Sequence, residues 1–396
     1  MLIGIVGGPN RGKSTFFKAC TLANVLIANY PFATIEPNKG FGFVKVKDVA
    51  REFGKTANPR TGYVQGDWRF VPVELLDVAG LVPGAHEGKG KGNEFLNDLN
   101  MADALIQVID ASGSVTIEGE PASPGAMDPA ADVRFLQEEL DYWYLRIIKN
   151  GWERFARQVQ QTHEQIPKAI AKQLGGVRVT EDLVKRAIKD LQLPPSILAW
   201  TDEQLYNFAS HLRRATKPLI IAANKTDVPG ALENIERLKK EFPDTVIIGC
   251  SADRELALKE AAKHGLISYV PGERSFSVTH PEKLNDAQRH ALDQMLAFVK
   301  DHGTGVQDIL NTVVFETLGC LAIHPGGVSK LEDSEGRCLP DCFLLPRNST
   351  ALDFAFRLHT DFGEKFIRAV DVRTKLPRGK DYALKQLDVL EIVAGR

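Results

Sequence analysis

The chain has 396 residues, 43% hydrophobic and 25% charged, a globular composition that excludes a disordered or fibrous protein. Its 49 basic and 51 acidic residues give a net charge of −2, so no overall positive charge draws the chain to nucleic acid. Five scattered cysteines, none in a Cys-x-x-Cys pair, indicate neither a disulfide framework nor a zinc site. Since no apolar run fits a signal peptide or a membrane span, we expect a cytoplasmic protein of two or three domains.

Short apolar runs followed by glycine or polar residues predict the buried strands of an α/β fold. These runs are Leu2–Val6, Val71–Leu76, Leu105–Ile109, Leu219–Ala223 and Thr245–Ile248. Apolar residues at helical spacing lie between them, beginning with a helix predicted over Lys13–Ala23. This alternation predicts a mostly parallel sheet with helices on both faces.

The alternation of strands and helices stops after Asp110. Residues 112–132 are rich in Gly, Pro, Ser and Ala, as loops are, and residues 133–216 contain no strand pattern. Apolar side chains there recur at helical spacing, and Thr180 and Thr201 precede acidic residues as helix N-caps do. We predict a loop and a helical insertion over 112–216, within a domain formed by residues 1–111 and 217–303.

The last part of the chain predicts a small α+β domain over residues 304–396. A helix is expected over Gly305–Leu318, and another begins at Ser349-Thr350, where Asp353 is placed for a reciprocal cap with Thr350. The predicted strands are Cys320–Ile323, Cys342–Leu345, Phe366–Val372 and Val389–Val393.

The segment from Gly7 to Ser14, GGPNRGKS, matches the pattern GxxxxGK[ST] between the first predicted strand and the first predicted helix. Its glycines let backbone N–H groups converge on the α- and β-phosphates of a nucleotide, and the helix dipole adds favourable charge. Lys13 is placed to reach the β- and γ-phosphates and the Ser14 hydroxyl to bind Mg²⁺. The predicted nucleotide-binding residues of this loop are Gly8, Pro9, Asn10, Arg11, Gly12, Lys13, Ser14 and Thr15.

A DxxG motif, Asp77-Val78-Ala79-Gly80, follows the strand predicted over Val71–Leu76. After a phosphate-binding loop, Asp77 can hold Mg²⁺ through water, and the Gly80 amide can sense a γ-phosphate. A loop between the two motifs must supply a second Mg²⁺ ligand, and Thr34 in the segment Asn29–Thr34 is the candidate. The alternative is that Thr34 belongs to an ordinary turn.

The motif Asn224-Lys225-Thr226-Asp227 ends the strand predicted over Leu219–Ala223 and indicates a guanine-binding site. Asp227 can accept hydrogen bonds from N1–H and the exocyclic amine of guanine, whereas adenine would leave the desolvated carboxylate unpaired. Lys225 is expected to lie across the base, and Asn224 to tie this loop to the phosphate-binding loop. In Cys250-Ser251-Ala252, after the next strand, the Ala252 amide is expected to meet guanine O6, with Ser251 beside it.

These motifs give the chain a resemblance to the Obg-related GTPases of the translation-factor class, in particular the Obg-like/YchF group. The segments 7–17, 29–38, 77–96 and 102–113 carry the resemblance. From about residue 320 the chain resembles a TGS domain, a β-grasp module, through segments 345–361 and 382–393. Because Asp227 is present, the resemblance is closer to the archaeal and eukaryotic sister branch than to YchF itself, where an altered fourth motif accompanies ATP use.

The resemblance implies a P-loop fold, and a Mg²⁺-dependent GTPase that hydrolyses GTP to GDP and phosphate as a switch linked to the ribosome or translation. A contact with ribosomal or transfer RNA is implied, and we expect a monomer. Basic residues at 152–189 and at 368–380 could form that contact, or could simply be solvated. Two alternatives stay open: an ATP-hydrolysing YchF-like protein, and a nucleotide sensor with little turnover whose TGS domain binds a regulatory ligand.

The residue that orients the attacking water is not evident from the sequence. Many GTPases have Gln directly after DxxG, but here the position is Leu81. Asn10 stands in a PNxGKS loop, which in similar GTPases binds K⁺ near the phosphates. K⁺ is therefore a candidate cofactor, unless Asn10 only braces its loop. His86, in the glycine-rich stretch 84–92, is the other candidate for orienting water.

Overall fold

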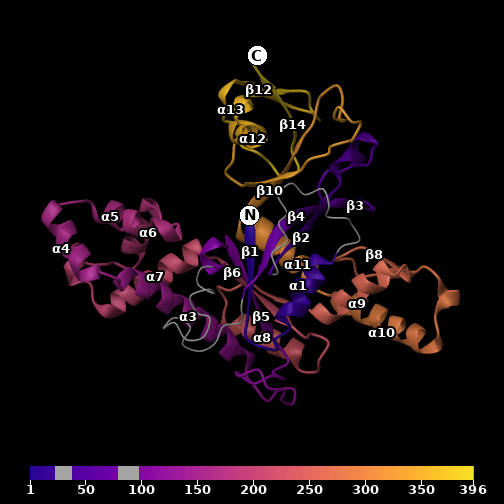
Figure 1. Cartoon of the computed structure of the whole chain (residues 1–396), viewed down its shortest axis with the longest axis horizontal. Helices are drawn as coiled ribbons and strands as arrows, with labels where there is room; N and C mark the ends of the chain where they lie inside the picture. Colours follow the sequence, from indigo (N-terminus) through magenta and orange to yellow (C-terminus); the bar gives the residue numbers. More distant parts are fainter. Residues whose placement is uncertain (23–37, 79–97, 396) are drawn as a thin grey trace. The chain divides into compact units, whose positions relative to one another are not determined.

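The computed structural model describes residues 1–22, 38–78 and 98–395 (Figure 1). The chain divides into two units, one of residues 1–17 and 75–253 and the other of residues 18–74 and 254–396. Helix α1 (Lys13–Thr21), strand β4 (Trp68–Asp77) and helix α9 (Ala252–Lys263) continue from one unit into the other. None of the described helices is long and apolar enough to cross a membrane.

A seven-stranded sheet has the order β2-β4-β1-β5-β6-β7, with β3 paired to β4. Besides β4, its strands are β1 (Leu2–Val6), β2 (Lys39–Lys47), β3 (Tyr63–Gln65), β5 (Ala104–Asp110), β6 (Leu219–Asn224) and β7 (Ile247–Gly249). Strands β1, β5, β6 and β7 pair in parallel. Every residue of β5 is buried, as in a central strand covered on both faces. The predicted mostly parallel sheet and its five predicted strands are confirmed.

Strands β2 and β3 were not predicted. In β2 the sequence KGFGFVKVK interrupts the apolar residues with glycines and lysines, and β3 has only three residues. β3 and β4 form an antiparallel hairpin in which Tyr63 lies opposite Phe70. The rings of Tyr63 and Phe70 stack with their centroids 4.5 Å apart. The hairpin is thus stabilised by a cross-strand aromatic pair that strand periodicity did not reveal.

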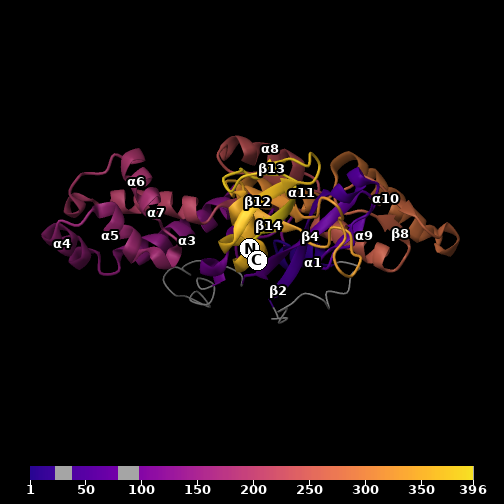
Figure 2. The ribbon, with the colours of Figure 1, turned by 90° about the horizontal axis from the view of Figure 1, so that it is seen from above.

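Residues 129–216, named here the helical segment, contain the helices predicted after Asp110. They are α3 (Pro129–Lys149), α4 (Trp152–Thr162), α5 (Ile166–Gln173), α6 (Glu181–Asp190) and α7 (Asp202–Thr216), with short 3₁₀ turns at Gly175–Val177 and Ile197–Ala199. Figures 1 and 2 show α3 and α7 side by side, leading from the sheet to α4, α5 and α6. Thr180 and Thr201 cap α6 and α7 as predicted, and Thr201 forms a capping box with Gln204.

A buried lysine attaches the end of the helical segment to the chain beside β5. Lys217 is 0% exposed, and its Nζ donates hydrogen bonds to the carbonyl oxygens of Asn100 (2.8 Å) and Ala102 (2.7 Å). Burial, aided by the charge of Arg178, lowers the pKa of Lys217 to about 8. Leu99 and Ala102 belong to the same core cluster as Leu140 and Phe208 of the helical segment, so the attachment is apolar as well as polar.

Further helices and a small hairpin precede the C-terminal sheet in the part of the chain that the structure describes. Helix α8 (Ala231–Glu241) packs against the sheet, with Ile235 and Leu238 in a cluster that includes Ile221 and Ile247. The other elements are η2 (Val49–Phe53), β8 (Ile267–Tyr269), β9 (Phe276–Val278), η6 (Pro281–Lys283), α10 (Asp286–His302) and α11 (Val306–Asn311), which continues as a π-helix over Thr312–Thr317. The helix predicted over Gly305–Leu318 is therefore present, with a change of helical type in its second half.

The C-terminal residues form a second sheet with the order β11-β10-β14-β12-β13. Its strands are β10 (Cys320–Pro325), β11 (Phe343–Pro346), β12 (Phe366–Asp371), β13 (Pro377–Arg378) and β14 (Val389–Ala394), with helices α12 (Ala351–Leu358) and α13 (Thr360–Glu364) beside it. The predicted reciprocal cap of Thr350 and Asp353 is confirmed. Phe354 of α12 is fully buried against this sheet. The α+β architecture is confirmed, and the boundaries of the three predicted domains stay predictions.

This C-terminal part packs on residues 48–70 of the same unit. The guanidinium of Arg69, 1% exposed, donates to the carbonyl oxygens of Leu339 (2.6 Å) and Pro340 (2.9 Å). Arg60 pairs with Asp333 (2.8 Å) and Asp341 (2.7 Å). An apolar cluster that includes Val49, Ala57, Leu331, Leu339 and Val389 lies between the two segments. Buried apolar contacts and directed hydrogen bonds therefore hold the C-terminal sheet to the hairpin.

A buried histidine makes this unit sensitive to acid. His324 is fully buried, with Nδ1 3.3 Å from the Asp341 carbonyl oxygen, and burial lowers its pKa to about 3. In an unfolded chain its pKa would be about 6.5, so between these values only the unfolded chain binds the proton. Stability contributed by the neutral ring is therefore lost as the pH falls below about 6.5.

We expect the unfolding free energy of the wild type, relative to His324→Gln, to decrease by about 1.4 kcal/mol per pH unit between pH 6 and 4. Urea unfolding of both proteins, followed by circular dichroism at several pH values, measures this difference. Parallel pH curves for the two proteins would contradict it.

Candidate nucleotide-binding site

The predicted phosphate-binding loop is a turn between β1, which ends at Val6, and α1, which begins at Lys13. Gly12 has φ +87, and a side chain there would collide with the Nδ2 atom of Asn224, so only glycine allows this approach. Asn10 has φ 57, a left-handed conformation that asparagine tolerates better than most residues. The loop is therefore shaped by two residues whose types suit its backbone.

The side chains of Lys13 and Asp77 form an ion pair, which joins the phosphate-binding loop to the end of β4. Both are mostly buried, with side-chain exposures of 13% and 20%. Lys13 is predicted to bind the phosphates and Asp77 to hold Mg²⁺, and the structure brings these two side chains together. Such a pair can open when a nucleotide provides phosphate oxygens for the ammonium group.

Asn224, at the end of β6, connects three of the predicted motifs. Its Nδ2 donates to the carbonyl oxygen of Arg11 at 3.0 Å, and its Oδ1 accepts from the Ala252 backbone N–H at 3.0 Å. The phosphate-binding loop, the NKxD motif and the segment Cys250–Ala252 therefore share one buried amide. Because β1, β6 and β7 run parallel, all three follow the carboxyl ends of strands at the same edge of the sheet.

The two other residues of the predicted base-reading motif are held by side-chain contacts. The Ser251 hydroxyl donates to Asp227 Oδ1 at 2.7 Å, which orients the carboxylate. Lys225 has φ 68, and its Nζ lies 2.9 Å from Asp110 Oδ2 and 3.3 Å from the Ser114 hydroxyl. A left-handed lysine is strained and persists where its surroundings impose the conformation.

The remaining predicted residues fall into two groups. Gly8, Pro9, Ser14 and Thr15 lie on the turn and the first residues of α1, with Ser14 exposed. Thr34, Gly80 and His86 lie outside the described residues. The Ser14 hydroxyl and the Asp77 carboxylate are oxygen donors, which suit Mg²⁺, an ion that takes few protein ligands and completes its shell with phosphates and water. The predicted roles of all these residues stay predictions.

The loop that follows β5 contacts the phosphate-binding loop, a contact that no sequence motif predicted. We name residues 110–132 the strap, which runs from the last residue of β5 into the first turn of α3. Asn10 Nδ2 donates to the Gly119 carbonyl oxygen at 2.8 Å. The guanidinium of Arg11, a residue 2% exposed, donates to Asp132 at 2.5 and 2.8 Å and to the Thr116 carbonyl oxygen at 2.8 Å. The side chain of Arg11 thus points to the strap, while its carbonyl oxygen accepts from Asn224.

Asp110, the last residue of β5, holds the other end of the strap and was also missed. Its Oδ1 accepts from the Ser112 N–H (3.0 Å) and hydroxyl (2.6 Å), and its Oδ2 from the Ser114 N–H (3.1 Å) and hydroxyl (2.9 Å) as well as from Lys225. Burial alone would raise the pKa of this carboxyl, but the hydrogen bonds from Ser112 and Lys225 outweigh it and lower the pKa. Asp110 is therefore a buried, charged residue beside the base-reading motif.

A parallel sheet with a phosphate-binding loop after its first strand, an aspartate at the end of β4 and an NKxD motif after β6 defines a P-loop nucleotide hydrolase. The comparisons agree with this class. The family model described as 50S ribosome-binding GTPase matches residues 2–125. The model described as Obg-like GTPase YGR210-like, G4 motif-containing domain matches residues 222–327, and the TGS domain model matches residues 332–394.

A GTP-binding protein of Methanocaldococcus jannaschii is 46% identical over 395 residues, 99% of each chain. The ribosome-binding ATPase YchF of Mycoplasma genitalium is 35% identical over 265 residues, 64% of this chain and 66% of that one. The crystal structure of a GTP-binding protein from Pyrococcus horikoshii matches over 100% of both chains with a TM-score of 0.78 and 36% identity. The Schizosaccharomyces pombe YchF structure matches in fold with a TM-score of 0.60 and 19% identity, over 99% and 97% of the chains.

The chain therefore belongs to the family of Obg-like GTP-binding proteins, with a segment that matches the YGR210-like G4 domain and a C-terminal TGS domain. The resemblance inferred from the motifs is confirmed.

The Arg11–Asp132 ion pair allows a matched test of burial. Asp132→Asn leaves the nearly buried guanidinium without a charged partner, which we expect to reduce the unfolding free energy by about 3 kcal/mol. Asp128→Asn changes the ion pair of Asp128 with Arg237, in which the arginine and aspartate side chains are 44% and 49% exposed. It should change the unfolding free energy by less than about 1 kcal/mol. Urea unfolding of the two variants measures both values, and equal losses would contradict the assignment.

Proposed function

We propose that this protein binds GTP, hydrolyses it to GDP and phosphate, and acts as a nucleotide switch linked to the ribosome. The observation that carries the proposal is the Asn224 amide, which is bonded to both the phosphate-binding loop and the Ala252 backbone. The phosphate-binding loop and the base-reading motif are thereby held at the same edge of one sheet. Neither motif alone would place a guanine nucleotide so specifically.

In this proposal the backbone N–H groups of the phosphate-binding loop and the Lys13 ammonium hold the β- and γ-phosphates. Ser14 and Asp77 would hold Mg²⁺, with Thr34 as a further ligand, and the ion when bound would neutralise charge on the phosphate oxygens. The ion pair between Lys13 and Asp77 would then open, because each group gains a closer partner of opposite charge. The Gly80 amide is proposed to sense the γ-phosphate.

Selection of guanine over adenine rests on Asp227. Its Oδ1 accepts from the Ser251 hydroxyl, and the carboxylate is proposed to accept from N1–H and the exocyclic amine of guanine. Adenine has no such pair of donors, so binding it would leave the carboxylate desolvated and unpaired. This argument favours GTP over ATP as the substrate.

Orientation of the attacking water is proposed to involve a monovalent cation near Asn10, with His86 as the other candidate. The Asn10 amide nitrogen donates to Gly119, and an amide can at the same time offer its oxygen to a cation. K⁺ at this position would place positive charge beside the phosphates, as an arginine finger does.

We expect turnover of GTP to exceed that of ATP, to be faster in KCl than in matched NaCl, and to lose its K⁺ dependence in Asn10→Ala. Asp227→Ala should reduce the preference for GTP over ATP at least about tenfold, because the carboxylate that distinguishes the bases is gone. Phosphate release by purified protein, in parallel GTP and ATP titrations, measures this preference. The exposed Asp244→Ala, with the same change of residue, is the control.

Equal use of ATP and GTP by the wild type would contradict the role of Asp227 and favour the YchF-like alternative. Tight nucleotide binding with negligible turnover would favour the sensor alternative.

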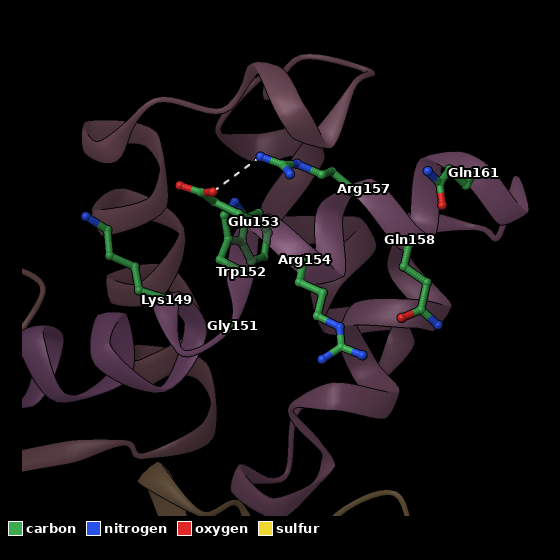
Figure 3. A pocket seen from close by; sticks show the side chains of 8 residues that line it. All are labelled: Lys149, Gly151, Trp152, Glu153, Arg154, Arg157, Gln158 and Gln161. Atoms are coloured by element: carbon green, nitrogen blue, oxygen red, sulfur yellow. Dashed lines mark hydrogen bonds and ion pairs between the residues drawn. The ribbon is translucent and has the colours of Figure 1, made fainter.

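The ribosome link is supported by similarity to proteins that include a ribosome-binding ATPase, and by a polar surface groove. The groove, about 740 Å³ in volume, lies at the junction of α3 and α4 and contains none of the predicted nucleotide-binding residues. Its lining residues, shown in Figure 3, are Lys149, Gly151, Trp152, Glu153, Arg154, Arg157, Gln158 and Gln161. We propose that this groove contacts phosphates of ribosomal or transfer RNA.

The exposure of the arginines favours this groove. Arg154 is exposed and points away from Glu153 (Figure 3). Arg157 lies 3.5 Å from Glu153, but with side chains 70% and 87% exposed the pair is weak and leaves Arg157 able to bind a phosphate. In the C-terminal basic stretch two of the five basic residues are held by acidic partners, since Arg373 is bidentate to Glu52 (2.6 and 3.1 Å) and Arg378 pairs with Asp371, whereas Arg368, Lys375 and Lys380 are exposed.

We expect the double variant Arg154→Glu/Arg157→Glu to lower the affinity for ribosomes about tenfold or more and to weaken its salt dependence, because two phosphate contacts are lost. Co-sedimentation with ribosomes of the source cells at several KCl concentrations measures both effects. Lys239→Glu/Lys240→Glu on α8 has the same change in charge and serves as the control. Equal losses for the two variants would show a general charge effect instead of a groove.

A further inference from the structure

The strap connects the two halves of the proposed nucleotide site. At one end Asp110 receives the Lys225 ammonium at 2.9 Å, and at the other Asp132 receives the Arg11 guanidinium at 2.5 and 2.8 Å. Between these ends, Gly119 lies against the phosphate-binding loop, where an added Cβ would stand 2.9 Å from Pro9 side-chain atoms. One continuous segment therefore contacts both the base-reading motif and the phosphate-reading loop.

The position of Asp110 is set by the sheet. In the parallel register of β5 and β6 it lies opposite Asn224, the residue before Lys225. Its exposed fraction is 2%, and both carboxylate oxygens accept hydrogen bonds from Ser112 and Ser114. The carboxylate is therefore fixed in direction before Lys225 reaches it.

Lys225 needs such a fixed partner. Its backbone is left-handed, with φ 68, and a lysine side chain has many rotamers in solution. A buried carboxylate at 2.9 Å selects one direction for the side chain. The stem of Lys225 is then ordered before a base arrives, so less conformational entropy is lost on binding.

We propose that Asp110 is a positioning residue of the nucleotide site. Asp110 holds Lys225 in the orientation that accepts the guanine base, and through the strap it keeps Lys225 correctly placed relative to the phosphate-binding loop. The proposal rests on the proposed guanine nucleotide site. The contacts of the base and of the phosphate-binding loop are the same for GTP and GDP. Loss of Asp110 therefore weakens the binding of both nucleotides equally. Such a loss of uniform binding raises KM and leaves kcat nearly unchanged.

A double-mutant cycle on Asp110 and Lys225 tests this role. We expect Asp110→Asn and Lys225→Met each to weaken GDP binding about tenfold or more and to speed GDP release accordingly. The double variant should bind no more weakly than Lys225→Met alone, because both changes remove one shared interaction. Calorimetric titration with GDP and stopped-flow release of a fluorescent GDP measure these quantities, and turnover of GTP gives KM and kcat.

Two further variants separate positioning from folding. Gly119→Ala keeps Asp110 and Lys225 but pushes the strap from Pro9, and it should also speed GDP release. Ser123→Ala changes an exposed strap side chain and should match the wild type. If Asp110→Asn does not fold, Gly119→Ala and a Ser112→Ala/Ser114→Ala variant, which keeps the carboxylate charge, still show whether a loosened strap releases GDP faster.

The outcomes distinguish this proposal from the proposed function. A wild type that binds no guanine nucleotide overturns the proposed function. The positioning role alone is overturned if the wild type binds GDP and the losses of GDP affinity in Asp110→Asn and Lys225→Met multiply in the double variant. Unchanged GDP release in both Asp110→Asn and Gly119→Ala overturns it as well.

Discussion

The site depends on one side-chain amide, that of Asn224. An amide has a donor and an acceptor on the same planar group, so it can fix two backbone segments at a defined separation. Here it donates to the Arg11 carbonyl oxygen and accepts from the Ala252 N–H, both at 3.0 Å. A carboxylate could not donate and a lysine could not accept. The approach also requires glycine at position 12, so the NKxD motif and the phosphate-binding loop constrain each other's residues.

Buried cationic side chains connect distant segments of the chain in a second way, by hydrogen bonds from their charged groups. Arg69 and Lys217 donate to pairs of backbone carbonyl oxygens, and Arg11 to Asp132 and a carbonyl oxygen. Removing a cation from water is unfavourable unless its donors are satisfied, so each of these side chains is strongly directional once buried. The acceptors belong to the segment 100–102, the strap and the loop before β11. Each buried cation thereby joins segments that are far apart in the sequence.

Much of the fold was predictable because its signals are local. The apolar runs of β1, β5 and β6, the caps at Thr180 and Thr201, and the reciprocal cap at Thr350 each depend on a few adjacent residues. The strand β2 was missed because glycines and lysines interrupt its apolar residues. The site shows the same division, since the motifs are contiguous in sequence, whereas the pairs Arg11–Asp132 and Lys225–Asp110 join residues more than a hundred positions apart. A single buried arginine or aspartate leaves no repeating pattern in the sequence. The composition of the strap therefore predicted a loop and none of its contacts.

The arrangement also locates where selectivity between nucleotides must arise. Phosphates are common to GTP and ATP, so a phosphate-binding loop cannot distinguish them, however well it is formed. In the proposed guanine site, discrimination belongs to the ends of β6 and β7, where Ser251 contacts Asp227 and Asp110 contacts Lys225. These two carboxylates have different chemical tasks. Asp110 is 2% exposed and accepts hydrogen bonds from several protein donors, so it can only orient a neighbour, whereas Asp227 is partly exposed. The proposed base recognition therefore uses two carboxylates differently: the partly exposed Asp227 would bind the base, and the buried Asp110 would hold Lys225 in place.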